Sequence, residues 1–219
     1  LVAKTEGRRE VFRDGPPECD SGLIDDAARR LRSAKRPLIV AGGGVISAGA
    51  PAELAGLARR LGAPVITSVM GRGSIPETDP LWLGVLPNYR STQAALERAD
   101  VVLAVGCRFT HRSTKGLLLK LDFGPEQTLI HLDIDPLVIG LMHRASVGIV
   151  GDARNGLGGL LAALGKGPAA TEWDAAWIRA QREIRWPRYK ETVDRLITTA
   201  HRCSSRRSAA RARRRRRAS

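Results

Sequence analysis

Glycines and a guanidinium follow two apolar segments of this sequence in a pattern that suits binding of a nucleotide diphosphate. The first cluster, Gly42 to Ser47, is close to the G-x-G-x-x-G pattern, in which glycines let backbone amides approach a pyrophosphate. The second, Gly106 to Arg108, joins a glycine to a side chain that can donate paired hydrogen bonds to phosphate oxygens. Each is equally compatible with an ordinary tight turn, or with a solvated arginine, that holds no ligand.

Two carboxylates occupy comparable positions later in the chain. Asp133 stands at the carboxyl end of an apolar segment, where a carboxylate can accept hydrogen bonds from a ribose or an adenine. Asp152, like Asp135 before Pro136, is also placed to cap a helix or turn. We expect a cap at Asp152 and a ligand contact at Asp133. An NAD-binding domain would carry an acid about 20 positions after the glycines, where Thr67 to Met70 offers none, so that interpretation is disfavoured.

Other kinds of site find little support. The four histidines and three cysteines show no metal-ligand spacing and no C-x-x-C pair, so the cysteines are expected to be reduced thiols. The sequence lacks G-x-S-x-G, H-E-x-x-H and the P-loop pattern. We therefore predict no catalytic residue and no metal ligand.

The candidate residues follow segments whose periodicity predicts a parallel sheet. Continuous apolar runs favour buried strands at residues 37–41, 64–68, 101–105, 128–133 and 147–150. Helical periods lie between them: after Ser21 as the expected N-cap, over residues 54–61 before Gly62, and in a short helix that ends at Arg98. This alternation predicts an α/β, Rossmann-like fold with helices on both faces. The turns at Gly42, Gly106, Asp133 and Gly151 should then converge on one crevice.

Composition divides the chain into four parts. Residues 1–21 are a polar linker, 22–165 form one domain, and 166–200 are a helical exit segment with Trp173, Trp177 and Ile178 at helical spacing. Residues 201–219 are an arginine-rich coil. The absence of a long apolar run and of a secretory signal favours a cytoplasmic protein.

The net charge of +14 is concentrated in that tail. Residues 201–219 hold nine arginines and no acid, and without them the net charge is +5. The tail is either an arm for nucleic acid or an anionic surface, or an incidental C-terminus produced by a change of reading frame. We favour the second, so a nucleic-acid partner is not expected.

Six segments in series resemble the central domain of thiamine-diphosphate-dependent enzymes such as acetolactate synthase, glyoxylate carboligase and oxalyl-CoA decarboxylase. They are residues 34–44, 61–67, 70–76, 100–109, 131–136 and 151–152. The resemblance implies a sheet of about six parallel strands, lying in the parent enzyme between a pyrimidine-binding and a diphosphate-binding domain. The parent would be a 2-oxo-acid carboligase or lyase and a homo-oligomer.

The resemblance also implies cofactors. Thiamine diphosphate and magnesium would be held only in the parent, by a G-D-G motif that this sequence lacks, so this chain alone would not be catalytic. The central domain carries FAD in acetolactate synthases and ADP in oxalyl-CoA decarboxylase, and is empty in other relatives. Departures at residues 84–89 and 108–112 leave all three open. The contacts carried over are Gly42, Gly43, Gly44, Gly106, Arg108, Asp133, Ile134 and Asp152.

Two rival functions stay open at this point. The chain could be a free-standing module that binds an adenine nucleotide or NAD, since related Rossmann-like sheets do so. It could also bind nucleic acid through its arginine-rich tail.

Overall fold

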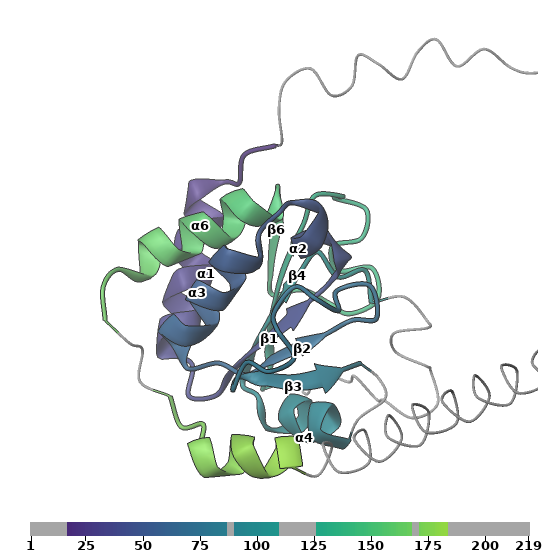
Figure 1. Cartoon of the computed structure of the whole chain (residues 1–219). Helices are drawn as coiled ribbons and strands as arrows, with labels where there is room; N and C mark the ends of the chain where they lie inside the picture. The colour runs from purple at the N-terminus through teal and green to yellow at the C-terminus, as the bar shows by residue number, and fades with distance from the viewer. Residues whose placement is uncertain (1–16, 87–89, 110–125, 168–170, 184–219) are drawn as a thin grey trace, which may run out of the picture.

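The computed structural model describes residues 17–86, 90–109, 126–167 and 171–183 (Figure 1). The arginine-rich tail, residues 184–200 of the expected exit segment and most of the expected linker lie outside the described residues, as do Cys203, His111 and His201. No helix within the described ranges is long and apolar enough to cross a membrane.

A six-stranded parallel sheet forms the centre of the molecule, in the order β3-β2-β1-β4-β5-β6 (Figure 1). This is the strand order of doubly wound dinucleotide-binding folds, and it confirms the predicted Rossmann-like class. The strands are β1 (Pro37–Ala41), β2 (Val65–Thr67), β3 (Trp82–Val85), β4 (Val101–Val105), β5 (Thr128–Asp133) and β6 (Val147–Val150).

Helices cover both faces of the sheet. On one face lie α1 (Ser21–Ser33), α3 (Pro51–Leu61) and α6 (Ala153–Leu164), which pack on alternate strand residues such as Ile39, Leu103 and Ile130. The other face, which includes Leu38, Val102 and Leu129, packs against α4 (Arg90–Arg98) and residues 171–183. A short helix, α2 (Gly43–Ser47), follows β1 directly. Burial on both sides explains why the strands are continuous apolar runs.

The helix ends follow from local chemistry. The N-cap of α1 is Asp20 rather than the predicted Ser21, because the Asp20 carboxylate accepts a hydrogen bond from the Leu23 amide at 2.9 Å. Ser21 is the first helical residue. The end of α3 agrees with the prediction, since Gly62 has a left-handed φ of 56° that a side chain would disfavour.

The edge strand β3 was not located from the sequence. It has only four residues and contains Gly84, whose φ is 135°. Its register with β2 also shifts between Val65 and Ile66. A short run broken by glycine carries little periodic signal, although the family resemblance implied a sixth strand.

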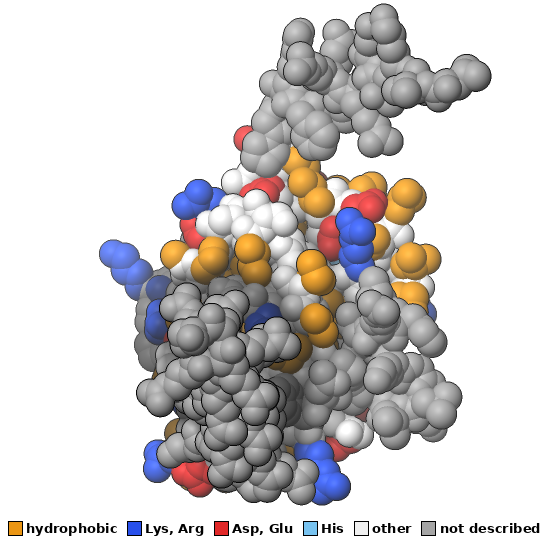
Figure 2. Space-filling view, turned by 45° about the vertical axis from the view of Figure 1, so that its right-hand side comes forward, with side chains coloured by type: hydrophobic (Ala, Val, Ile, Leu, Met, Phe, Trp, Pro, Cys, Tyr) orange, Lys and Arg blue, Asp and Glu red, His pale blue; other side chains and the backbone are white. Residues whose placement is uncertain are grey.

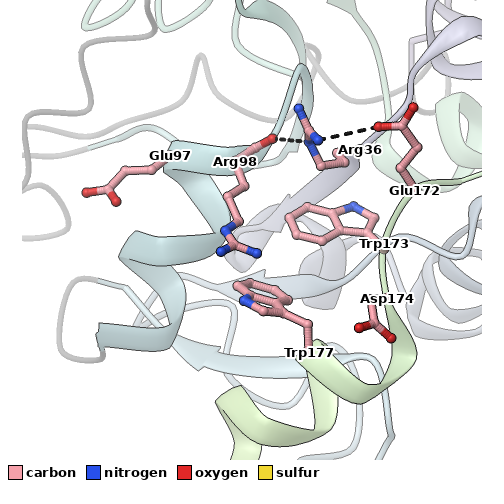
Figure 3. A pocket seen from close by; sticks show the side chains of 7 residues that line it. All are labelled: Arg36, Glu97, Arg98, Glu172, Trp173, Asp174 and Trp177. Carbon is pink, nitrogen blue, oxygen red and sulfur yellow. Dashed lines mark hydrogen bonds and ion pairs between the residues drawn. The ribbon is translucent and has the colours of Figure 1, made fainter.

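Residues 171–183 pack back under the N-terminal end of β1 (Figure 3). Trp173 is only 8% exposed, and its indole N–H donates to the carbonyl of Pro37 at 2.6 Å. Trp177 stacks on Trp173 with ring centroids 5.1 Å apart, and the Arg98 guanidinium lies over the Trp177 ring. Within the described residues the helix covers 175–183. The helical spacing of Trp173 with Trp177 predicted that Trp173 belongs to this helix, but it lies just before it. This part of the expected exit segment is anchored to the domain.

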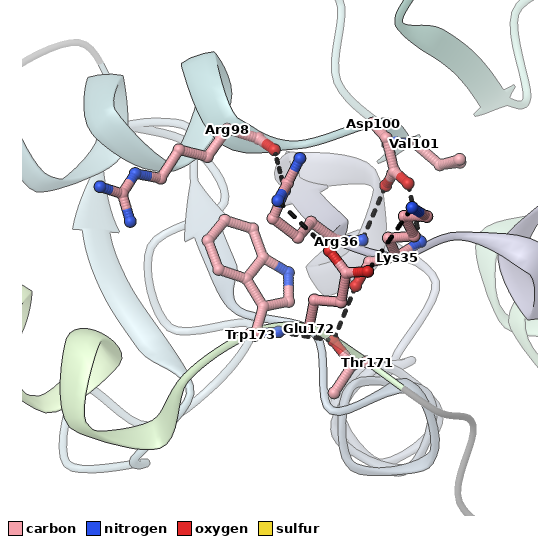
Figure 4. Close-up of polar contacts among 8 residues, drawn as sticks. All are labelled: Lys35, Arg36, Arg98, Asp100, Val101, Thr171, Glu172 and Trp173. Carbon is pink, nitrogen blue, oxygen red and sulfur yellow. Dashed lines mark hydrogen bonds and ion pairs between the residues drawn. The ribbon is translucent and has the colours of Figure 1, made fainter.

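Charged residues form hydrogen bonds and ion pairs at the same end of the sheet (Figure 4). The Asp100 carboxylate accepts hydrogen bonds from the backbone amides of Lys35 and Arg36, at 2.7 and 2.8 Å. Glu172 pairs with the side chains of Arg36 and Lys35 at 3.4 and 3.7 Å. Because these pairs are exposed, each contributes less than about 1 kcal/mol. The buried indole of Trp173 is therefore the stronger anchor.

Candidate functional site

A cleft opens where the strand order reverses, between the carboxyl ends of β1 and β4. Parallel sheets bind their ligands at this position. The cleft has a volume of about 420 Å³ and is lined by residues that follow four strands: Gly43, Gly44, Ser47, Ser68, Met70, Gly106, Cys107, Arg108, Phe109, Asp133 and Ile134. The turns after β1, β4 and β5 therefore converge as predicted, whereas the fourth predicted turn, at Gly151 after β6, does not line the cleft.

Backbone packing forms the floor of the cleft. The Gly44 amide donates to the Gly106 carbonyl at 3.1 Å, and the Gly42 amide donates to the Val105 carbonyl at 2.8 Å. A side chain on Gly42 would overlap the Gly106 carbonyl, and Gly106 itself has a φ of 55°. These glycines are thus required by the contact between the two turns, whether or not a ligand is present. The case for a ligand depends on the cleft and its charged walls.

Opposite charges stand on two walls of the cleft. Arg108 is exposed in the turn after β4 and can reach an anion from solvent. Asp133, at the end of β5, is only 6% exposed, and one carboxylate oxygen accepts the Asp135 amide at 3.0 Å. A fork of donors and a fixed carboxylate suit a ligand that combines phosphate oxygens with hydroxyl or amino donors.

Of the remaining predicted residues, one lines the cleft and two do not. Ile134 lines the cleft and is half exposed, whereas Gly42 is buried beneath it. Asp152 caps α6, where its carboxylate accepts the amides of Arg154 and Asn155 at 2.9 and 3.2 Å. Asp152 does not line the cleft. The expected turn cap is also present at Asp135, which accepts the Leu137 amide at 3.0 Å.

Five lining residues were not among the predicted contacts: Ser47, Ser68, Met70, Cys107 and Phe109. Ser68 and Met70 follow β2, and Ser47 ends α2. The Ser68 hydroxyl accepts the Gly71 amide at 3.0 Å, while the Met70 side chain is 77% exposed above Gly43. The rule that places ligands at carboxyl ends of strands applies to β2 as well, and it would have identified Ser68 and Met70.

Exposed apolar side chains continue outward from the cleft, and the surface in Figure 2 shows hydrophobic groups beside charged ones. Ile134, Leu137 and Leu141 follow β5, and Val69 and Met70 follow β2. All five are at least half exposed. A ligand or a neighbouring protein surface with an apolar part would be accommodated here.

A buried thiol and a buried imidazole lie behind the Arg108 wall. Burial raises the pKa of the Cys107 thiol to about 11, so the thiol is neutral and unreactive. Burial lowers the pKa of His131 below its ordinary value. The His131 Nε2 lies 3.0 Å from the Cys107 carbonyl oxygen. Neither group is placed for nucleophilic or acid–base chemistry at the cleft surface.

A second hollow, of about 310 Å³, lies at the opposite end of the sheet beside Trp173 and Trp177 (Figure 3). Its two arginines are held by protein groups, because the Arg36 Nε donates to the Arg98 carbonyl at 2.7 Å, Arg36 also pairs with Glu172, and the Arg98 guanidinium lies over the Trp177 ring. Across the part of the chain that the structure describes, no group of three or more His, Cys, Asp or Glu side chains could hold a metal ion, and Cys19 and Cys107 form no disulfide.

Comparison with known proteins adds independent information. A family model described as the central domain of thiamine pyrophosphate enzymes matches residues 24–160. The chain is 46% identical over 143 residues to the "Probable acetolactate synthase large subunit" of Methanocaldococcus jannaschii, which covers 64% of this chain and 24% of that protein. It is 39% identical over 158 residues to the acetolactate synthase large subunit of Corynebacterium glutamicum, covering 71% and 25%.

The chain is also similar to a relative with a different name and to one solved structure. The chain is 42% identical over 137 residues to a sulfoacetaldehyde acetyltransferase of Castellaniella defragrans, covering 60% of this chain and 22% of that protein. A crystal structure of a "putative thiamin diphosphate-dependent enzyme" from Mycobacterium smegmatis superposes with a TM-score of 0.60 at 28% identity, over 70% of this chain and 29% of that one. The chain thus spans about a quarter of the length of the curated relatives it matches.

Proposed function

Since the chain belongs to the family of thiamine pyrophosphate enzyme central domains, we propose that it serves an acetolactate synthase-like enzyme as a domain that binds an adenine nucleotide. The parent activity in this proposal is that of a 2-oxo-acid carboligase or lyase. The names of the relatives support this class, and the sulfoacetaldehyde acetyltransferase among them leaves the particular substrate open.

One observation carries the nucleotide proposal: Arg108 and Asp133 face a common cleft at the topological switch point. The Arg108 guanidinium would bind the diphosphate oxygens, and the free oxygen of Asp133 would accept a hydrogen bond from the ribose or adenine. The volume of about 420 Å³ lies in the range of small-molecule sites.

ADP and FAD share the adenosine diphosphate part that these residues would hold. Met70 and Ile134 extend the cleft as an apolar wall, which favours a ligand with a further ring system. Residues 87–89 and 110–112, where the resemblance to FAD-binding members weakens, lie outside the described residues. The proposal therefore names an adenine nucleotide and leaves FAD and ADP as outcomes of the test.

Thiamine diphosphate, when bound in the parent enzyme, supplies the carbanion chemistry. The described residues of this chain would contribute packing and the nucleotide site, and no residue of the sequence provides the G-D-G motif for the diphosphate and its magnesium. Incubation of the chain alone with pyruvate, thiamine diphosphate and Mg²⁺ should yield no acetolactate. Formation of acetolactate would contradict this assignment.

Titration calorimetry of the purified protein with ADP, ADP-ribose and FAD, and with adenosine as the control without phosphate, tests the nucleotide site directly. We expect at least one diphosphate ligand to bind, and adenosine to bind at least tenfold more weakly, since a charged hydrogen bond to phosphate contributes about 1.5–3 kcal/mol. Mass spectrometry of small molecules released on denaturation identifies any copurified nucleotide. Binding of none of the three ligands, with none released, would overturn the proposal.

A further inference from the structure

A buried histidine connects the two walls of the cleft. His131 lies in β5 and is only 1% exposed, among the apolar residues of the sheet. Its Nε2 lies 3.0 Å from the carbonyl oxygen of Cys107, in the turn that carries Arg108. Its Nδ1 lies 3.4 Å from the amide nitrogen of Gly140, in the segment that follows Asp133 and Ile134. One side chain thus contacts the backbone of both walls.

The two backbone partners determine where the proton lies on the ring. The Cys107 carbonyl can only accept a hydrogen bond, so Nε2 must carry the proton. The Gly140 amide can only donate, so Nδ1 must present its lone pair. The geometry is therefore satisfied by one tautomer of the neutral imidazole, and protonation of Nδ1 would remove the acceptor for Gly140.

The Arg108 wall needs such support because its backbone is strained. Phe109 has a φ of 48°, which is rare for a bulky residue. The Phe109 ring is 2% exposed and packs edge-on against His131, with centroids 5.6 Å apart, and against His143 at 5.3 Å. His131 thus holds the turn by a hydrogen bond to Cys107 and by a ring contact to Phe109.

We propose that neutral His131 is a positioning residue of the cleft, which keeps the turn of Arg108 and the segment after Asp133 at the separation that a bound nucleotide needs. This inference rests on the proposed nucleotide function and adds its dependence on pH. Burial of the ring opposes its protonation most strongly and so lowers the pKa of His131, whereas Asp133 and the hydrogen bond to the Cys107 carbonyl favour protonation, and His143 opposes it.

The expected pH profile has a definite sign. Burial lowers the pKa of His131 from its ordinary value near 6.5, so the imidazole is neutral at pH 7. Affinity should be constant at neutral pH and should fall as the pH drops below that ordinary value through the pKa of the folded protein. ADP-ribose is the appropriate probe, because its diphosphate has no terminal phosphate with a pKa near 6 that would titrate in the same range.

Two variants separate the contacts. The side-chain amide of His131→Gln can reach the Cys107 carbonyl but leaves Gly140 without an acceptor, whereas the carbonyl of His131→Asn replaces the Nδ1 acceptor but cannot reach Cys107. Leu129→Ala is the matched control, because Leu129 is equally buried on the same face of β5, toward its other end. Calorimetry with ADP-ribose between about pH 5 and 8 is combined with amide hydrogen exchange of residues 107–109 and 137–141.

Each histidine variant should bind ADP-ribose about two- to tenfold more weakly at pH 7 and lose the acid-side fall in affinity. His131→Gln should speed exchange in residues 137–141, and His131→Asn should speed it in residues 107–109. Leu129→Ala should lower stability with neither effect. Unchanged exchange in both segments, or an acid-side fall that persists in the variants, would overturn the positioning role. If the wild-type protein binds no nucleotide, the proposed function fails, and the exchange measurement still decides whether His131 couples the walls.

Discussion

A Cβ built on Gly44 would lie 2.7 Å from the Cα of Gly106, so the turns that end β1 and β4 touch backbone to backbone. A real side chain could not come so close to the Gly106 Cα unless one of the two turns moved. The floor of the cleft is thus made of main chain from two halves of the sheet. Its shape depends on the absence of side chains more than on any that are present.

Gly44→Ala should lower the free energy of unfolding by about 1–3 kcal/mol, because the methyl group must push the two turns apart. Urea denaturation measures the effect. Gly158→Ala is the control: Gly158 lies within α6, a Cβ there meets no atom within 4 Å, and helix propensity should raise stability by about 0.5–1 kcal/mol. Wild-type stability in Gly44→Ala would show that the turns are not tightly packed.

Arg108→Ala should weaken ADP binding by about ten- to a hundredfold, since a charge-assisted hydrogen bond to phosphate is lost. Arg108→Lys should recover only part of the affinity, because an ammonium lacks the paired donors. Calorimetry compares both with Arg29→Ala, whose exposed side chain on α1 pairs with Asp26 at 2.9 Å, away from the cleft. Equal affinities of Arg108→Ala and Arg29→Ala for ADP would show that Arg108 does not contact the nucleotide.

Asp133→Asn should reduce ADP affinity by about tenfold with little change in stability. The Asn carbonyl can still accept the Asp135 amide, whereas the second carboxylate oxygen is replaced by a donor that repels a ribose hydroxyl proton. Asp152→Asn is the matched control, because asparagine caps a helix as well as aspartate does and Asp152 lies outside the cleft. A loss of affinity in Asp152→Asn would contradict the separation of these two carboxylates.

Stability should fall above about pH 9 because of Cys107. The unfolded thiol has a pKa near 9, while burial raises the pKa of the folded thiol to about 11. Between these values the unfolded chain binds fewer protons than the folded protein, so the free energy of unfolding decreases as pH rises, by up to about 1.4 kcal/mol per pH unit. Urea unfolding at about pH 8 and 10 should show a steeper decrease in the wild type than in Cys107→Ala. Parallel decreases would mean that Cys107 is accessible to solvent.

Trp173→Ala should destabilise the domain by about 3–5 kcal/mol, through the cavity that it leaves under β1. Trp173→Phe should cost less, because it removes mainly the indole hydrogen bond to Pro37. Glu172→Gln tests the neighbouring exposed ion pairs and should cost under about 1 kcal/mol. Chemical denaturation gives all three values, and a larger effect for Glu172→Gln than for Trp173→Ala would contradict the assigned anchor.

The buried strands were predictable because hydrophobicity alone specifies them. Pro37–Ala41, Val101–Val105, Thr128–Asp133 and Val147–Val150 agree with the predicted ranges, and β2 is shorter than the predicted 64–68 by one residue at each end. β1 and β4 are buried on both faces and apolar at every position, whereas β5 also contains Thr128, His131 and Asp133. The edge strand β3 has no such signal.

The cleft was only partly predictable, since spacing along a chain does not reveal side-chain partners. Gly106, Arg108 and Asp133 could be placed together from the rule on strand ends. The roles of His131 could not be, because both of its hydrogen bonds go to backbone groups of residues 24 and 9 positions away, which leave no pattern in sequence. The N-cap at Asp20 was missed because Ser21 is an equally good cap in isolation.

The two hydrogen bonds that the amides of Lys35 and Arg36 donate to Asp100 also bear on the order of folding. These partners are 64 and 65 positions apart, and they bring the starts of β1 and β4 together at the middle of the sheet. While the chain is being synthesised, β1, β2 and β3 emerge first, and β1 has one side without a partner until β4 arrives. That open side is a template for pairing with a neighbouring chain. Pairing of β4 along the whole of β1, beside the Asp100 hydrogen bonds, covers that open side.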